Sequence, residues 1–166
     1  MKDISATKAT SLIFNSPIGR IKITESDDFV VGVELTDDPI TLNKHEVLLK
    51  CKSQLKQFFS GARKSFKLPL KVGGTAFQKK VFDELCRIPY GKTTSYAAIA
   101  RQIGSPGAYR AVGMANNRNK HLIIVPCHRV IGSDGSLVGY AGGLVKKKFL
   151  LDLEKYQHVQ KGMDIE

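Results

Sequence analysis

Within the first 40 residues, apolar positions fall in three short runs, a pattern that predicts β-strands. The runs are rich in β-branched residues, and turn-forming Asn, Ser, Pro, Gly and Asp residues separate them. The strands expected are Ser11 to Phe14, Arg20 to Glu25 and Phe29 to Leu35. From Asn43 to Ser60 the apolar spacing changes to three and four residues, which predicts an amphipathic helix. The pattern therefore predicts an α+β N-terminal lobe, in which Cys51 packs in the core.

The pattern breaks at Lys67 to Gly74, which predicts a linker between two lobes. Thr75 follows as a candidate N-cap of the next helix, whose apolar stripe ends in Leu85 and Ile88. We therefore expect an N-terminal lobe over residues 1–70 and a mostly helical C-terminal lobe over residues 71–166. Cys86, beside Leu85, is expected to be packed and inert.

Two short helices around a glycine-containing turn are expected next, and this arrangement is typical of a helix-turn-helix. Ser95 can cap a helix from Tyr96 to Ile103, and a second helix runs from Ala108 to about Asn116. Alanines and a glycine make the second helix thin, while Arg110 provides a long cationic side chain near its start. Both close helix packing and insertion into the minor groove of DNA explain a thin helix.

The net charge adds a possible partner to this picture. The chain has 26 Lys and Arg residues against 15 Asp and Glu residues, a formal charge of +11. Such a surface attracts nucleic acid, although lysine-rich faces also serve solubility alone. No apolar run is long enough to span a bilayer, and Met1 to Thr10 lacks the apolar stretch of a signal peptide. We therefore expect a cytoplasmic protein with free thiols, associated with the nucleoid if the source is prokaryotic.

The continuously apolar run from Leu122 to Val125 predicts a buried strand that delivers Cys127, His128 and Arg129 at its end. The histidine and the arginine could favour the thiolate, which is the nucleophilic form of a cysteine. A cysteine hydrolase is an alternative function. However, neighbours on an extended strand point to opposite faces, so a Cys127–His128 pair would need a sharp turn or an intervening water. The cysteines and histidines show no metal-ligand spacing, so we expect no metal site.

A glycine-rich segment, Gly132 to Gly143, follows the thiol and is either the wall of a site for a flat ligand or a long surface loop. The last predicted helix, Leu144 to Tyr156, places Glu154 on its apolar side. A carboxylate there needs a partner, which a lysine, an arginine or a histidine could provide. His128 is the histidine next to the thiol.

Four motifs in register resemble those of the O6-alkylguanine-DNA alkyltransferases. They are Pro89-Tyr90-Gly91-Lys92-Thr93-Thr94-Ser95-Tyr96, Arg110-Ala111-Val112-Gly113, Pro126-Cys127-His128-Arg129-Val130 and Tyr140-Ala141-Gly142-Gly143-Leu144. The likeness is strong from Phe77 to Glu154, whereas the N-terminal half contributes only Ser16-Pro17-Ile18-Gly19 and Leu68-Pro69-Leu70. The resemblance implies a ribonuclease-H-like N-terminal lobe and a helix-turn-helix that enters the minor groove. It also implies a cofactor-free monomer acting on double-stranded DNA that contains O6-alkylguanine, and on O4-alkylthymine as well.

The resemblance assigns roles to residues, motif by motif. Cys127 is implied as the alkyl acceptor, His128 as its water-linked base, and Glu154 as the carboxylate that orients the histidine. Asn119 would brace the turn that holds the thiol, and Arg110 would fill the gap left by a flipped nucleotide. The residues assigned to DNA contact are Tyr96, Ser105, Arg110 and Ser133. The residues assigned to the alkylated base are Tyr96, Val130, Tyr140 and Ala141, and the backbone of Cys127, Val130 and Ala141 would read the guanine edge.

The chain departs from the family pattern at a few positions. Lys120 and Leu122 stand where the family often has prolines, and Ala141 stands where some relatives have serine. A non-enzymatic relative that only binds alkylated DNA is an alternative, but such proteins lack the acceptor cysteine. A helix-turn-helix regulator would need a dimer interface or an effector domain, and the sequence indicates neither. The expected product is a thioether, which offers no acyl group for water to attack, so one protein molecule should repair one lesion.

Overall fold

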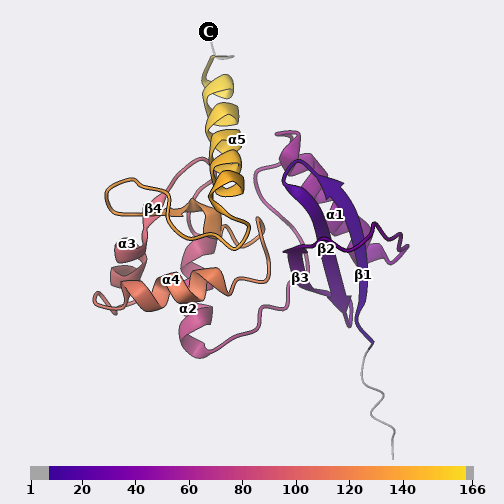
Figure 1. The fold of residues 1–166 in the computed structure, drawn as a ribbon, viewed down its shortest axis with the longest axis horizontal. Helices are drawn as coiled ribbons and strands as arrows, with labels where there is room; N and C mark the ends of the chain where they lie inside the picture. The colour runs from indigo at the N-terminus through magenta and orange to yellow at the C-terminus, as the bar shows by residue number, and fades with distance from the viewer. Residues whose placement is uncertain (1–7, 164–166) are drawn as a thin grey trace, which may run out of the picture.

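The computed structural model describes the backbone of residues 8–163 and the side chains as far as Tyr156. The segment Met1 to Thr10, in which we expect no signal peptide, therefore lies mostly outside the described residues. A sheet with one helix forms one lobe, and the remaining helices form a second lobe beside it (Figure 1). The α+β class predicted from the sequence is confirmed. Within the described residues, no helix has the length and apolar character needed to cross a membrane.

The first lobe is an antiparallel sheet packed against one helix. Its strands are β1 (Thr10–Ser16), β2 (Gly19–Ser26) and β3 (Phe29–Leu35), in the order β1-β2-β3, and α1 (Glu46–Phe59) covers the sheet. Asp27 and Asp28 both have positive φ, at 54° and 64°, as a two-residue hairpin turn requires. The predicted strands and helix are confirmed: β3 has the predicted ends, and the ends of the other elements move by one to three residues.

The second lobe contains the remaining elements. They are α2 (Ala76–Cys86), β4 (Thr94–Ser95), α3 (Tyr96–Gln102), α4 (Tyr109–Asn117), the 3-10 turn η1 (Cys127–Arg129), β5 (Val130–Ile131) and α5 (Leu144–Met163). Thr75 caps α2 through a capping box with Gln78, and the Ser95 hydroxyl accepts a hydrogen bond from the Ala98 amide at the start of α3. Both predicted caps are confirmed. α3 and α4 pack together as the predicted helix-turn-helix.

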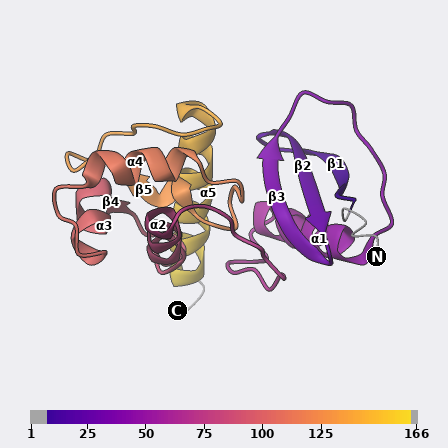
Figure 2. The same ribbon diagram turned by 90° about the horizontal axis from the view of Figure 1, so that it is seen from below.

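The two lobes are joined along β3 (Figure 2). The Val33 amide donates to the Lys120 carbonyl at 2.7 Å, and the Leu122 amide donates to the Val33 carbonyl at 3.0 Å. The buried His121 ring adds a 3.1 Å hydrogen bond from Nε2 to the Val30 carbonyl. The first lobe therefore fixes the segment that leads to Cys127, which gives it a positional role.

The strand predicted from Leu122 to Val125 is wrong, because this segment folds as tight turns. Ile123 has a φ of 72°, and the Val125 amide donates to the His121 carbonyl at 2.9 Å. All four residues of the run are buried, so the apolar pattern identified burial correctly and the backbone conformation incorrectly. Asn119 explains the difference. Its side chain donates to the Val125 carbonyl and accepts from the His121 amide. These backbone groups therefore have partners without pairing to a neighbouring strand.

Candidate active site

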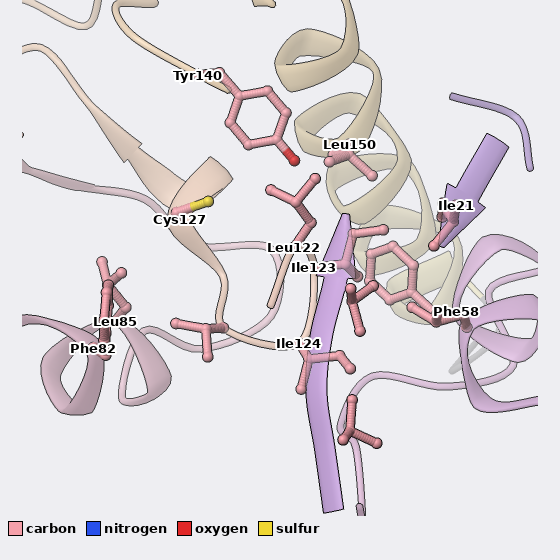
Figure 3. Packing of buried hydrophobic residues seen from close by; sticks show 14 of the residues in the cluster. Ile21, Phe58, Phe82, Leu85, Leu122, Ile123, Ile124, Cys127, Tyr140 and Leu150 are labelled. Carbon is pink, nitrogen blue, oxygen red and sulfur yellow. The ribbon is translucent and has the colours of Figure 1, made fainter. Parts of the chain in front are cut away.

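Cys127 is the first residue of the 3-10 turn, and only 2% of its surface is exposed. Its amide donates to the Val125 carbonyl at 2.8 Å, and its carbonyl accepts from the Asn116 side chain at 3.3 Å. Figure 3 shows its sulfur in the same apolar cluster as Tyr140 and Leu122. Backbone bonds and packing therefore hold the thiol in one place. Sequence reasoning missed Asn116, although a polar residue at a buried helix position is a signal.

His128 follows Cys127 in the same 3-10 turn and not on an extended strand. The expectation that the two side chains point to opposite faces of a strand therefore does not apply. Its ring is fully buried, and Nε2 lies 2.7 Å from Glu154 Oε1. Nδ1 is buried and has no hydrogen-bond partner, so the ring makes no direct bond to the thiol. The ring is thus turned toward α5, and a hydrolase-type Cys127–His128 hydrogen bond is not formed.

Glu154 joins three segments of the lobe through its buried carboxylate. Besides His128, the carboxylate accepts from the Gly91 amide at 3.1 Å and from two guanidinium nitrogens of Arg129 at 2.9 Å each. Burial would raise the pKa of Glu154, but the hydrogen bonds and charges of His128 and Arg129 lower it to about 2. The carboxylate is therefore ionised at neutral pH, and the structure gives it both the histidine and the arginine as partners.

The Glu154 carboxylate fixes the tautomer of His128. An ionised carboxylate only accepts hydrogen bonds, so Nε2 must be the protonated ring nitrogen and Nδ1 must hold the lone pair. Burial lowers the pKa of His128 and keeps the ring neutral, although Glu154 opposes this effect. The site therefore contains a neutral imidazole with a free basic nitrogen.

The surroundings of Cys127 favour the neutral thiol over the thiolate. Burial raises the pKa of Cys127 to about 11, while a hydrogen bond with Asn119 and the positive charge of Lys147 act in the opposite direction. Arg129, which the sequence suggested as a neighbour that favours the thiolate, is instead bound by Glu154 and by the Ile88 carbonyl. At neutral pH the thiol is protonated and needs a base before it can react.

Lys147 is the site residue that sequence reasoning missed. Its side chain is fully buried, and Nζ donates to the carbonyls of Val130 at 2.5 Å, Val138 at 2.8 Å and Gly139 at 3.0 Å. Burial lowers its pKa to about 8, although Cys127 has the opposite effect. A signal was present, because Lys147 lies seven residues before Glu154 on the same face of α5.

Tyr96 completes this part of the site. Its hydroxyl donates to the Val138 carbonyl at 2.8 Å, and Lys147 Nζ lies 3.4 Å from the hydroxyl oxygen. Gly139 has a φ of 56°, which favours glycine, and a Cβ there would be in ordinary contact with the hydroxyl at 3.6 Å. We call Tyr96, Val138, Gly139 and Lys147 the Tyr96 cluster; it ties the glycine-rich segment to α3 and α5.

The structure brings some of the predicted site residues together and leaves others apart. Cys127, His128, Glu154, Asn119, Val130, Tyr140 and Tyr96 all belong to the buried interior or to the Tyr96 cluster. Ala141 is exposed beside Tyr140, Ser105 lies in the α3–α4 turn, and Ser133 lies in the exposed part of the glycine-rich segment.

The face of α4 differs from the thin surface expected. Ala115 points into the core, and Arg110 is exposed with its guanidinium 5.9 Å from the Tyr109 ring. A Cβ at Gly113 would lie 3.8 Å from the Tyr96 ring, which is an ordinary van der Waals distance, so this position packs against Tyr96 without requiring glycine. Part of the small-residue pattern thus serves packing inside the protein.

The other two thiols differ from Cys127. Cys51 is fully buried in the first lobe as predicted, and burial raises its pKa to about 12. The prediction that Cys86 is packed is wrong, because it is exposed at the last residue of α2. The 3.6-residue period leaves the neighbour of a buried Leu85 on the solvent side.

Two further features lie away from the thiol. Within residues 8–156, one group could hold a metal ion, namely Glu25, Asp28 and His45, whose ligand atoms lie within 4.8 Å of one another. Sequence spacing did not reveal it, because Glu25 lies in β2, Asp28 in the β2–β3 turn and His45 at the N-cap of α1. A groove of about 740 Å³ runs between the lobes, with Glu34 and Lys120 among its lining residues, and Cys127 does not line it.

Both lobes of the chain match known protein families. Residues 11–72 match the family model "6-O-methylguanine DNA methyltransferase, ribonuclease-like domain", and residues 76–156 match "6-O-methylguanine DNA methyltransferase, DNA binding domain". A methylated-DNA–protein-cysteine methyltransferase of Methanosarcina barkeri is 49% identical over 150 residues, which cover 86% of this chain and 95% of the relative. The constitutive enzyme of that name from Bacillus subtilis is 44% identical over 157 residues, covering 88% and 95%.

Solved structures agree with the sequence matches. The crystal structure of the Mycobacterium tuberculosis O6-methylguanine methyltransferase superposes with a TM-score of 0.82 at 38% identity, covering 90% of this chain and 94% of that one. The Mycobacterium tuberculosis protein OGT in complex with DNA gives a TM-score of 0.80 at 40% identity, covering 87% and 92%.

Proposed function

Because the chain belongs to the 6-O-methylguanine DNA methyltransferase family, we propose that it repairs DNA by moving the alkyl group of O6-alkylguanine irreversibly onto Cys127. One observation supports the choice of acceptor above the others. Cys127 is a buried, rigidly held thiol next to a neutral histidine whose free Nδ1 is set by Glu154. Neither Cys51 nor Cys86 has such a neighbour among the described side chains.

The reaction begins with removal of the thiol proton. His128 Nδ1 accepts this proton through a bridging water, and Glu154 stabilises the imidazolium that results. The thiolate attacks the alkyl carbon in line, so a carbon–sulfur bond forms as the carbon–O6 bond breaks. The electron pair stays on the guanine, which then takes up a proton. The protein keeps a thioether, and no group in the site can regenerate the thiol.

The Tyr96 cluster suits the leaving group. Charge that develops on the guanine needs a hydrogen-bond donor in a site that excludes water. The Tyr96 hydroxyl is such a donor if it releases the Val138 carbonyl, and Lys147 beside the hydroxyl oxygen strengthens it. Tyr140 and Val130 provide apolar surface for the base.

The target carbon of O6-alkylguanine lies inside the duplex, so the nucleotide must leave the base stack, at a cost of a few kcal/mol. In the proposal, α4 lies in the minor groove, and the Arg110 side chain fills the gap that the flipped nucleotide leaves in the base stack. O4-alkylthymine presents the same kind of alkyl–oxygen bond and is a second substrate. We expect the protein to act as a monomer in the cytoplasm, at the nucleoid in a prokaryote, where reducing conditions preserve the Cys127 thiol.

A single-turnover assay tests the function. Duplex DNA containing O6-methylguanine is mixed with increasing amounts of protein, and restored guanine is counted. We expect one guanine per protein molecule and no further repair after that. Continued turnover by a fixed amount of protein, or the absence of repair, would exclude this function.

Replacing Arg110 by alanine should slow repair of duplex DNA by about 10- to 100-fold, if a flipped nucleotide costs a few kcal/mol and Arg110 offsets part of it. Reaction with free O6-benzylguanine should change much less, because a free base needs no flipping. Arg63→Ala, which removes one positive charge from the first lobe, is the matched control. Equal losses on both substrates would mean that Arg110 serves the fold or the base site instead.

Replacing Lys147 by methionine should slow transfer from duplex DNA and from the free base alike. Three carbonyls lose their shared donor, and hydrogen bonds to a charged group are worth about 1.5–3 kcal/mol, or about 10- to 100-fold in rate. Lys148→Met, on the exposed side of the same helix, is the control and should react at the normal rate. A normal rate for Lys147→Met would show that the cluster is not needed for the reaction.

A further inference from the structure

We propose that Met114 is an apolar wedge that enters the minor groove beside the lesion and helps Arg110 to hold the duplex open. The inference rests on the proposed function and adds a positioning residue that acts on DNA. Met114 was not among the residues that the sequence motifs singled out. It is one of the large apolar side chains that the structure leaves exposed, with 60% of its surface accessible.

Met114 lies in the middle of the solvent-facing side of α4. The exposed residues of this helix and its C-cap, apart from Tyr109 at the first position, follow helical spacing and form one face, which we call the outer face. They are Arg110, Ala111, Met114, Asn117 and Arg118. Val112, Ala115 and Asn116 are buried on the opposite side. Because Ala111 and Asn117 are shorter, Met114 is the apolar side chain that projects farthest from the centre of this face.

The charges of the outer face suit a polyanion. Arg110 and Arg118 stand four residues before and four residues after Met114, so each lies one helical turn away on the same side. Within the outer face there is no acidic side chain. An apolar residue between two arginines suits a duplex groove, because the arginines can reach the phosphates on either side while the apolar side chain enters between stacked base steps.

The outer face adjoins the candidate active site. Gly113 lies next to Met114, and a Cβ built there would lie 3.8 Å from the Tyr96 ring. Asn117 lies one turn after Gly113, and its Oδ1 would lie 3.6 Å from a Cβ built at Gly139. Gly113 and Asn117 therefore lie close to residues of the Tyr96 cluster. A duplex that presents a base to Cys127 would meet Met114 at the same time as Arg110.

Isolated apolar residues are common on protein surfaces and usually need no explanation. Met114 differs because it stands at the centre of a cationic face of a helix-turn-helix, beside the site of chemistry. Methionine also fits the role, since minor-groove proteins insert Phe, Leu, Ile, Met or Pro between base steps and unstack them. Its unbranched, flexible side chain can adapt to different steps.

The test compares Met114→Ala, Met114→Leu and the control Leu42→Ala, which truncates an exposed apolar residue of the first lobe. Single-turnover rates are measured at saturating protein on three substrates. These are a duplex with O6-methylguanine opposite cytosine, the same duplex with a bulge that already unstacks the lesion, and free O6-benzylguanine.

The proposal predicts that Met114→Ala repairs the paired duplex about 10-fold more slowly, since a wedge residue offsets part of the cost of unstacking the bases. The loss should shrink on the bulged duplex and fall below about 2-fold on the free base, which needs no unstacking. Met114→Leu should restore most of the rate because it keeps the apolar volume, and Leu42→Ala should match the unchanged protein.

Three results would overturn the proposal. They are an unchanged rate for Met114→Ala on the paired duplex, an equal loss on all three substrates, and an equal loss on the paired and bulged duplexes. The second would assign Met114 to the fold or the base site, and the third would make it a simple contact. Failure of the unchanged protein on all three substrates would instead count against the proposed function, so the two failures are distinguishable.

Discussion

Replacing Cys127 by serine should abolish alkyl transfer from both duplex DNA and free O6-benzylguanine. A hydroxyl is far less acidic than a thiol, so far less of it is deprotonated at neutral pH, and the neutral hydroxyl is a much weaker nucleophile toward a saturated carbon. We expect the rate to fall by more than about 10⁴-fold, beyond the 10²- to 10⁴-fold loss expected when a general base alone is removed. The rate is measured by the appearance of alkylated protein under single-turnover conditions.

The fold should survive this change, because Cys127 is held by its backbone and serine is slightly smaller than cysteine. Binding to undamaged duplex should also remain, since the outer face of α4 does not include Cys127. Cys86→Ser, at the exposed thiol, is the matched control and should transfer normally. Transfer that survives in Cys127→Ser, or that disappears in Cys86→Ser, would contradict the assignment of the acceptor.

The second large effect concerns activation of the thiol. Because burial raises the pKa of Cys127 to about 11, only a minute fraction is thiolate at neutral pH without a base. Replacing His128 by asparagine or Glu154 by glutamine should therefore slow transfer by about 10²- to 10⁴-fold, the range of general-base catalysis. The double variant should lose little more than either single variant, because residues that act as one relay fail together.

The pH dependence distinguishes a relay from a structural role. Without the base, the rate should follow the thiolate population, so it should rise about tenfold per pH unit toward the raised pKa of Cys127 and approach the unchanged protein there. A structural role of Glu154 predicts a loss that is uniform in pH, with a lower melting temperature. Glu154 also holds Arg129 and Gly91, and breaking a buried ion pair costs about 3–5 kcal/mol, so Glu154→Gln should lower the melting temperature in either case and the pH profile decides between the roles.

The sequence predicted the secondary structure well where one face of an element is buried. The strands of the first lobe follow from short β-branched runs between turn formers, and α1, α2 and α5 follow from apolar spacings of three and four residues. The Ser95 cap and the glycine-containing turn predicted α3 and α4. The failure at Leu122 to Val125 has a physical cause. A run that is apolar at every position is buried on all sides, and burial alone does not fix the backbone when a side chain such as Asn119 supplies the hydrogen bonds.

The candidate site was only partly readable from the sequence. Cys127 and His128 are adjacent, and Glu154 stood out as a carboxylate on an apolar face. Lys147 did not, because a lysine near the start of a helix in a chain of charge +11 is usually solvated, and its burial depends on carbonyls from β5 and the glycine-rich segment. Met114 was missed for a related reason, since a methionine between a glycine and an alanine suggests core packing until the direction of α4 is known.

Peptide mapping by mass spectrometry, after the protein reacts with duplex DNA containing O6-methylguanine, is the most direct test of the central claim. The account predicts one added methyl group per molecule, on the peptide that contains Cys127, with the peptides of Cys51 and Cys86 unmodified. Methylation of Cys86 or Cys51 in place of Cys127 would contradict it. Repair of many lesions per protein molecule by protein that stays unmodified would contradict it as well.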